Sequence, residues 1–187
     1  MNTETDIKMI EQLSRQREDA NWAFRSFLKG SGLSVMKIDA TVHDLYREVS
    51  AKIDCTKCAN CCKAIRPVLT AADIKRLACQ LELTTREFRV CFLLENEHGE
   101  GFVFNSQPCP FLRDNLCEVY ENRPRDCRSY PHLHKREFAL RMGQAIFNCS
   151  VCPIVFNVYE GLKEKLRPTL YQPSSRSFDA HRFKEEK

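Results

Sequence analysis

The sequence predicts a mostly α-helical fold with a small irregular or β element, arranged as a single cysteine-rich domain around a metal centre. Apolar residues recur every three or four positions in several segments, which is typical of helices packed on a core. Eleven of the 187 residues are cysteines, and most of them lie in a tight loop or in segments rich in proline and arginine. Because such segments form little regular structure, we expect bound metal to supply much of their stability.

Two helices without any cysteine are predicted at the N-terminus. Apolar side chains follow helical spacing through residues 7–27, and Gly30-Ser31-Gly32 is a stop signal, so one helix is expected over the first thirty residues. The apolar face of a second helix is formed by Ile38, Val42, Leu45, Val49 and Ile53. We expect the two helices to pack as a hairpin, which would make residues 1–53 an N-terminal helical extension.

Short elements are expected between residues 54 and 167, which we take as the metal-binding domain, with 168–187 as a polar tail. Capping boxes, in which a threonine precedes an acidic residue by three positions, mark two helix starts at Thr70-Asp73 and Thr84-Glu87. The other expected elements are a short strand at 102–104, a small hairpin over 111–120 and a last helix from Pro153 to Leu166.

Cysteine usage and charge exclude several classes of protein. No apolar run approaches the ~18 residues that a membrane-spanning helix needs, and the polar start lacks the apolar core of a signal peptide. An odd number of cysteines in a chain of this length argues against a secreted disulfide scaffold, so free thiols in the reducing cytoplasm are expected. The net charge of +4, with acidic residues interspersed among basic ones, gives no support for a nucleic-acid partner.

The tightest cysteine group is C-x-x-C-x-x-C, formed by Cys55, Cys58 and Cys61. Two-residue spacers let one backbone turn present several sulfurs to a single centre, and both zinc and iron–sulfur proteins use such runs. Cys62 follows directly. Because adjacent side chains usually point apart, we expect Cys62 either to serve a second centre or to be a spare thiol, and we favour a ligand role.

Further ligands are expected from later segments, where Cys109 and Cys152 each precede a proline. The nine candidate metal ligands are Cys55, Cys58, Cys61, Cys62, Cys109, Cys117, Cys127, Cys149 and Cys152. Nine thiols exceed one four-coordinate site and fit either two sites or one cluster with spare thiols. Cys79 and Cys91 lie instead within apolar helical patterns, and we expect both to be small buried core residues.

The loop from Cys55 to Cys62 resembles the signature of the CxxCxxCC cysteine-cluster family, the YkgJ-like proteins. Later segments match the family's motifs in order: C-P-F-L at 109–112, C-x-[IV]-Y-x-x-R-P at 117–124, C-R-x-[FY]-P at 127–131, and a late cysteine, here Cys149 or Cys152. The resemblance covers about residues 54–156 and implies a zinc- or iron-chelating domain without implying an activity. The sequence departs from many relatives at Ala59-Asn60, where they carry a glycine.

All-thiolate ligation suits both zinc and iron–sulfur clusters. The crowded loop and the two Cys-Pro pairs favour an iron–sulfur cluster as the cofactor, with zinc as the alternative. Arg123 and Arg128 flank Cys127, and we interpret them first as partners in ion pairs with nearby acidic residues and second as positive charges near the centre. His132 and His134 follow directly, and we expect surface or hydrogen-bonding roles for them because thiols are in excess.

Three functions from different classes fit these patterns. The first is a metal-binding protein whose centre is structural or redox-active, from which metal storage or delivery is not distinguishable by sequence. The second is an oxidoreductase or transferase that uses the centre, with Cys62 or Cys149 as a reactive thiol, although no catalytic residue is identified. The third is an interaction module stapled by zinc. The expected partner is a metal ion or cluster, no membrane is involved, and the charged N-terminal helix is suited to a homodimer interface.

Overall fold

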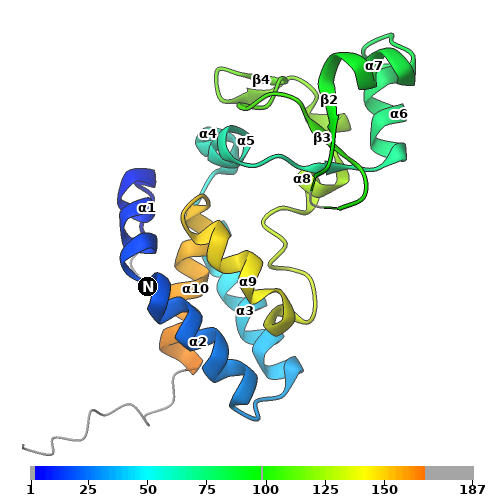
Figure 1. The fold of residues 1–187 in the computed structure, drawn as a ribbon. Coiled ribbons are helices and arrows are strands. Elements are labelled where there is room, and N and C mark those ends of the chain that lie inside the picture. Colours follow the sequence, from blue (N-terminus) through cyan, green and yellow to red (C-terminus); the bar gives the residue numbers. More distant parts are fainter. Residues whose placement is uncertain (1–2, 98, 167–187) are drawn as a thin grey trace, which may run out of the picture.

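The computed structural model describes residues 3–97 and 99–166, and Figure 1 shows that they form two lobes. The helical lobe consists of α1 (Ile7–Gln16), α2 (Glu18–Gly30), α3 (Val35–Ser50), α9 (Phe138–Cys149) and α10 (Pro153–Leu166). The cysteine lobe, residues 54–131, contains short helices and strands. Each lobe has its own cluster of buried apolar side chains. The structure is therefore mostly helical with small antiparallel sheets, as the sequence predicts.

The helical lobe is built around α3 and α10, which pack on each other and on α9. Val42, Met142 and Tyr159 are among its fully buried side chains. Burying a side chain of this size contributes about 1.5–3 kcal/mol, so this core is a major source of the lobe's stability. The predicted second helix is α3, and its four predicted helical face residues from Ile38 to Val49 are buried.

The prediction of a single helix over the first thirty residues is wrong, because the chain turns at Arg17. Helix α1 packs against α10 and α9, and α2 packs mainly against α9. Arg17 leaves helical geometry (φ −103°, ψ 10°), and its guanidinium forms an ion pair with Glu160 of α10 at 2.8 Å. With the turn at Arg17, both Ile10 of α1 and Phe24 of α2 are buried in the same apolar core.

Helix α9 has no start signal in its own sequence, and no helix is predicted there. Glu137, the residue before it, adopts a left-handed conformation (φ 58°). The cap comes instead from α3, because the Asp39 carboxylate accepts hydrogen bonds from the backbone N–H groups of Glu137 at 2.8 Å and Phe138 at 2.9 Å. A contact between residues about a hundred positions apart therefore starts this helix.

The cysteine lobe contains many short elements around a small core. Helices α6 (Ala71–Gln80) and α7 (Thr85–Phe92) begin at the two predicted capping boxes, and both boxes are formed. An antiparallel sheet of order β1-β3-β2 lies beside them, and β4 pairs with β5 as a hairpin. The remaining elements are α4 (Cys55–Cys58), α5 (Asn60–Ala64), β1 (Val68–Leu69), β2 (Leu93–Glu95), β3 (Phe102–Phe104), β4 (Leu112–Arg113), β5 (Leu116–Cys117), the 3-10 helix η1 (Tyr120–Asn122) and α8 (Arg125–Ser129).

The predicted strand at 102–104, the hairpin within 111–120 and the last helix from Pro153 to Leu166 are confirmed. The prediction that Cys79 and Cys91 are buried is wrong, because both are exposed. On α6 the core side is taken by neighbours such as Leu77, and on α7 by Phe88. The short apolar runs in the sequence therefore do not show which face of each helix packs against the core.

The division into residues 1–53, 54–167 and 168–187 stays a prediction, and its tail lies outside the described residues. In the structure, α9 and α10 share one apolar core with α1, α2 and α3. Among the helices of residues 3–97 and 99–166, none is both long and apolar enough to cross a bilayer.

Replacing the remote cap of α9 should weaken the helical lobe. We expect Asp39→Ala to lower the free energy of unfolding by about 2 kcal/mol, because two backbone N–H groups lose a charged acceptor in a buried setting. The matched control is Asp44→Ala on the same helix, where the exposed ion pair with Arg47 should contribute less than about 1 kcal/mol. Urea unfolding of both variants measures the difference, and equal losses would contradict the assigned role of Asp39.

Candidate metal centre

The C-x-x-C-x-x-C-C loop forms two short helical turns joined by one left-handed residue. The Asp54 carboxylate accepts from the Thr56 N–H at 3.0 Å and so starts α4. Ala59 has φ 48° and ψ 13°, a conformation that costs a residue with a Cβ about 1 kcal/mol or more. Here alanine adopts a conformation that glycine favours. The bend at Ala59 separates α4 from α5, so that each short helix carries its own cysteines.

A cavity of about 550 Å³ lies beside this loop, and six of the nine candidate ligands line it. Those six are Cys55, Cys61, Cys62, Cys109, Cys117 and Cys127. The other walls are largely apolar, with Ile65, Pro67, Phe104 and Phe111 among them. Cys58, Cys149 and Cys152 are absent from the described lining. Thiols that are up to 72 positions apart in sequence, Cys55 to Cys127, thus share one cavity.

Backbone hydrogen bonds bring the later cysteines to the loop. The Cys109 N–H donates to the Cys62 carbonyl at 2.9 Å, which joins the C-P-F-L segment to α5. Pairing of β4 with β5 sets Cys117 opposite Leu112. Cys127 lies on α8. The positions of these sulfurs are therefore fixed by local backbone structure as well as by any bound group.

The grouped thiols affect one another's protonation. Burial raises the pKa of Cys109 to about 11, and the nearby thiols of Cys62 and Cys117 also raise it. A hydrogen bond from the Phe111 N–H acts in the opposite direction. Burial and the proximity of Cys109 and Cys62 raise the pKa of Cys127 well above its usual value. A hydrogen bond from the Cys61 thiol lowers the pKa of Cys62 to about 7. Several thiolates in this space therefore need a compensating cation.

Donors suited to thiolates are already in place. Backbone N–H groups donate to three sulfurs: Phe111 to Cys109, Val119 to Cys117, and both Ile154 and Val155 to Cys152. The buried hydroxyl of Tyr130 lies beside the Cys152 sulfur, its hydrogen-bonding neighbour. Burial, and then the nearby thiols of Cys152 and Cys61, raise its pKa. A buried hydroxyl beside thiols is suited to donate to sulfur at a metal centre.

Cys152 and Cys149 belong to the helical lobe. Cys152 immediately precedes α10 and is buried. The Asn60 side chain donates to the Val151 carbonyl at 2.7 Å, which holds α5 next to Cys152. Cys149, at 1% exposure, lies in the core of the helical lobe near Glu160 and Lys163. Cys152 is thus close to the loop, while Cys149 is surrounded by apolar packing.

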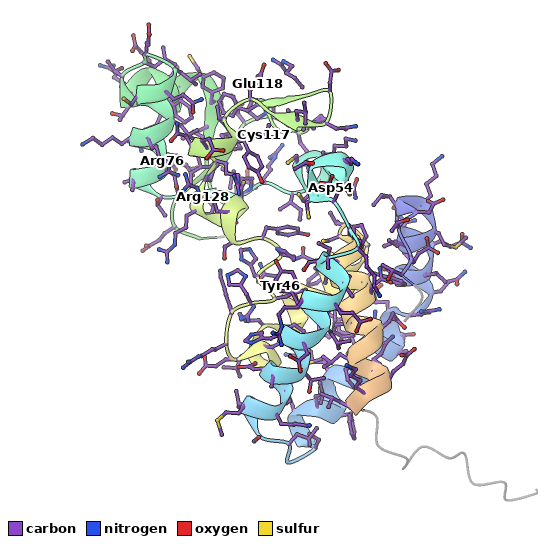
Figure 2. All side chains as sticks on the ribbon, turned by 180° about the vertical axis from the view of Figure 1, so that it is seen from behind. Tyr46, Asp54, Arg76, Cys117, Glu118 and Arg128 are labelled. Carbon is purple, nitrogen blue, oxygen red and sulfur yellow. The ribbon has the colours of Figure 1, made fainter. Side chains whose placement is uncertain are left out.

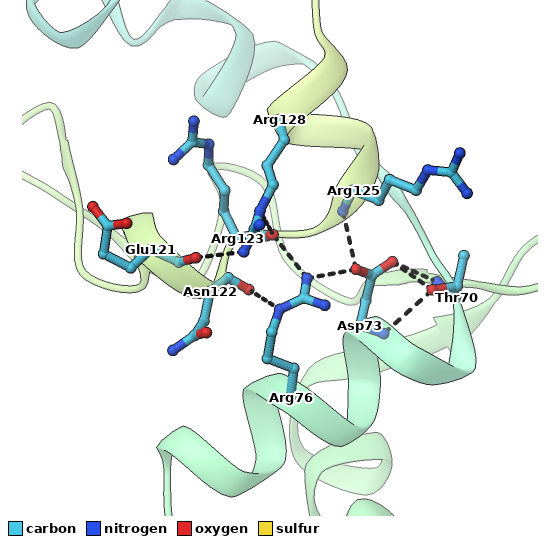
Figure 3. A network of polar contacts seen from close by, with 8 residues as sticks. All are labelled: Thr70, Asp73, Arg76, Glu121, Asn122, Arg123, Arg125 and Arg128. Atoms are coloured by element: carbon cyan, nitrogen blue, oxygen red, sulfur yellow. Dashed lines mark hydrogen bonds and ion pairs between the residues drawn. The ribbon is translucent and has the colours of Figure 1, made fainter.

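Two arginines, Arg76 and Arg128, hold the chain between Cys117 and Cys127. Figure 3 shows Arg76 and Arg128 donating to the carbonyl oxygens of the turn at residues 121–123. Arg76 also forms an ion pair at 2.6 Å with buried Asp73, whose carboxylate accepts from the Arg125 N–H at 3.0 Å. This network fixes the backbone that connects Cys117 to Cys127.

The arginine roles differ in part from those favoured by the sequence. Within the described part of the chain, Arg123 and Arg128 form no ion pair with an acidic residue. Arg128 binds carbonyl groups instead. Arg123 lies over the Tyr120 ring at 3.7 Å and lowers the pKa of Cys117, although burial raises that pKa overall. Arg123 therefore supplies positive charge beside the thiols.

The two histidines after the motif have different surroundings. His132 is buried, and its Nε2 lies 3.2 Å from the Asp126 carboxylate. His134 is exposed and lies 3.3 Å from the Ser129 hydroxyl. In residues 3–97 and 99–166, no three histidine, cysteine, aspartate or glutamate side chains are positioned to hold one ion. The sulfurs line the cavity walls rather than converging on a single point.

The donor chemistry fits a metal that prefers sulfur. The cavity presents thiols, apolar groups and a nearby guanidinium, whereas calcium and magnesium require several oxygen ligands. Zinc or iron held by thiolates matches the sulfur donors, the N–H groups aimed at sulfur and the Tyr130 hydroxyl beside Cys152. The fold and the site thus define a class of helical protein with a thiol-lined metal-binding cavity.

The comparison with known families agrees with this class. Residues 54–153 match the model of the CxxCxxCC family, which is described as "Putative zinc- or iron-chelating domain". The match covers more than half of the chain, and the protein belongs to this family. The finding supports metal binding in general. No curated protein and no solved structure matches the chain.

The Asp73 network should make the cysteine lobe sensitive to acid. Burial raises the pKa of Asp73, but hydrogen bonds from Thr70, Arg76 and the Arg125 N–H outweigh it and lower the pKa below its usual value. We expect Asp73→Ala to cost about 3 kcal/mol at neutral pH, because the variant leaves a partly buried guanidinium without its partner.

The sign of the pH effect follows from that lowered pKa. The carboxylate stabilises the folded chain above the unfolded pKa of about 3.9, and the contribution is lost as pH falls through the lower folded value. Denaturant unfolding of wild type and Asp73→Ala should therefore converge in acid. The control is Glu87→Ala in the other capping box, which is exposed and should have a small effect. A constant difference at every pH would refute the account.

Proposed function

We propose that the protein holds an iron–sulfur cluster in the thiol-lined cavity, in preference to zinc, and that the centre has a structural or redox role. The observation that carries this proposal is the distribution of six thiols around one cavity of about 550 Å³. A single tetrahedral zinc ion holds its four sulfurs about 3.8 Å apart, since each Zn–S bond is about 2.3 Å. A cluster of several iron and sulfide atoms suits thiols spread over wider walls.

The surrounding residues support this choice through their effect on charge. Phe111 and Val119 direct N–H groups at the sulfurs of Cys109 and Cys117, and Arg123 adds a positive charge near Cys117. Hydrogen bonds to sulfur and nearby positive charge favour the reduced state of a cluster. When bound, such a cluster supplies one-electron chemistry, and the apolar walls formed by residues such as Ile65 and Phe104 limit water around it.

A structural contribution accompanies any redox role. The cysteine lobe is made of short elements, and its strands contain only two or three residues each. Ligands from α4, α5, the hairpin and α8 would be joined by one centre, so metal binding would be coupled to folding of this lobe. We further propose a cytoplasmic location, because the eleven cysteines are free thiols and a reducing compartment keeps them available as ligands.

Anaerobic purification tests the proposal. We expect a brown protein that absorbs near ~400 nm and contains iron and acid-labile sulfide in similar amounts, as thiolate-bound clusters do. Cys109→Ser and Cys127→Ser should each lose at least about half of the iron, because each removes a cavity thiol. The matched controls are Cys79→Ser and Cys91→Ser, which change exposed cysteines outside the described cavity lining.

The outcomes separate the alternatives. A colourless protein with stoichiometric zinc and no sulfide would refute the cluster and support a zinc site. Iron retained at the wild-type level in both cavity variants would refute the assigned site.

A further inference from the structure

The cysteines near the cavity fall into two groups that meet at Cys61 and Cys62. These adjacent residues lie on α5 and are linked by a hydrogen bond between their thiols. Beyond them, one group extends into the cysteine lobe and the other extends toward the helical lobe. The two groups contain four cysteines each, which is the number of thiolates that a tetrahedral ion or a cubane cluster takes.

The first group is confined to the cysteine lobe and contains Cys62, Cys109, Cys117 and Cys127. All four line the cavity. Backbone structure joins them in sequence: Cys109 donates to the Cys62 carbonyl at 2.9 Å, and the hairpin returns the chain to Cys117. Each member lies near every other member, since each pair is coupled electrostatically. These four cysteines are enough for one four-coordinate centre, so no ligand from outside the cysteine lobe is needed.

The second group spans the junction between the lobes and contains Cys55, Cys58, Cys61 and Cys152. Cys55 and Cys58 are one helical turn apart on α4, so their side chains lie on the same side of it. The Asn60 side chain ties the loop to the Val151 carbonyl at 2.7 Å, directly before Cys152.

Two tyrosines surround this second group. Figure 2 shows Tyr46 at the end of α3 nearest the cysteine lobe, below Asp54 at the start of the loop. Burial, followed by nearby Cys55 and Cys152, raises the pKa of Tyr46. The Tyr130 hydroxyl lies near Cys61 and beside the Cys152 sulfur, its hydrogen-bonding neighbour. A hydroxyl donor beside these thiols is suited to a sulfur that carries negative charge at a metal centre.

We propose that the protein carries two metal centres, an inner centre bound by Cys62, Cys109, Cys117 and Cys127 and a junction centre bound by Cys55, Cys58, Cys61 and Cys152. This inference rests on the proposed function, because both centres take a thiophilic metal, either iron in a cluster or zinc. The adjacent Cys61 and Cys62 then belong to different centres, which places the two centres close together. The junction centre also joins α10 of the helical lobe to the loop.

Cys149 belongs to neither centre. Its thiol lies in the apolar core of the helical lobe, and burial raises its pKa strongly. The groups whose charge acts on it are Glu160, Lys163 and Cys152, all in the helical lobe. Cys149 and Cys152 form a C-x-x-C pair in sequence, but of the two it is Cys152 that has the loop cysteine Cys55 among the groups acting on it.

Metal content of single variants tests the division. We expect Cys117→Ser to lose the inner centre and Cys152→Ser to lose the junction centre, so that each retains about half of the wild-type metal. Cys149→Ala, the matched control from the same C-x-x-C pair, should retain all of it. Complete metal loss in both soluble ligand variants, or full retention in Cys152→Ser, would overturn the proposal of two centres.

A titration of the wild-type chain keeps the test decisive if a variant does not fold. Metal-free protein is titrated with Co²⁺ under anaerobic conditions, and the thiolate-to-cobalt absorption is followed. Saturation at two equivalents per chain supports two centres, whereas saturation at one equivalent overturns them. A protein purified with two zinc ions and no sulfide would support the division while refuting the iron–sulfur proposal. A protein that binds no metal in either experiment would refute both.

Discussion

Mutual repulsion between thiolates is the constraint on which the rest of this structure depends. The cavity brings together six sulfurs, and burial with thiol–thiol proximity raises the pKa of Cys109 and Cys127. Such raised pKa values favour the protonated thiol over the thiolate unless a cation is close. With a thiophilic cation, the same arrangement becomes favourable because deprotonated sulfur binds the metal strongly. The surrounding backbone therefore has to hold the cysteine side chains in place before a metal binds.

Polar contacts within the cysteine lobe provide that support. The Arg76 and Arg128 guanidinium groups bind three consecutive backbone carbonyls, and Asp73 anchors Arg76 on α6. Arginine suits this task because its planar group carries several donors in a fixed geometry. Arg128, which follows Cys127, thus helps to fix the backbone between Cys117 and Cys127, and Arg123 adds charge at the cavity.

The helical lobe has a different relation to the site. Its core is apolar and extensive, and residues such as Val42 and Met142 are fully buried. Yet it contributes Cys152 through the N-terminal end of α10, where backbone N–H groups point at the sulfur. Two proposed centres that share neighbouring loop positions would make the relative placement of the lobes dependent on metal. A stable lobe would then serve as the fixed support for a metal-dependent one.

The sequence by itself determined the class of site and much of the local structure. Cysteine spacing, the two capping boxes and Pro153 at the start of α10 are local signals, because each depends on residues a few positions apart. Three features were decided only by tertiary structure. Helix α9 starts on a carboxylate from α3, the first helix breaks at Arg17 so that both halves reach the core, and Cys79 and Cys91 face solvent. The different surroundings of Cys149 and Cys152 are of the same kind, since both lie in the core of the helical lobe but Cys152 is the one with the loop cysteine Cys55 nearby. Spacing identifies residues able to bind metal, but only packing between distant segments brings particular sulfurs together.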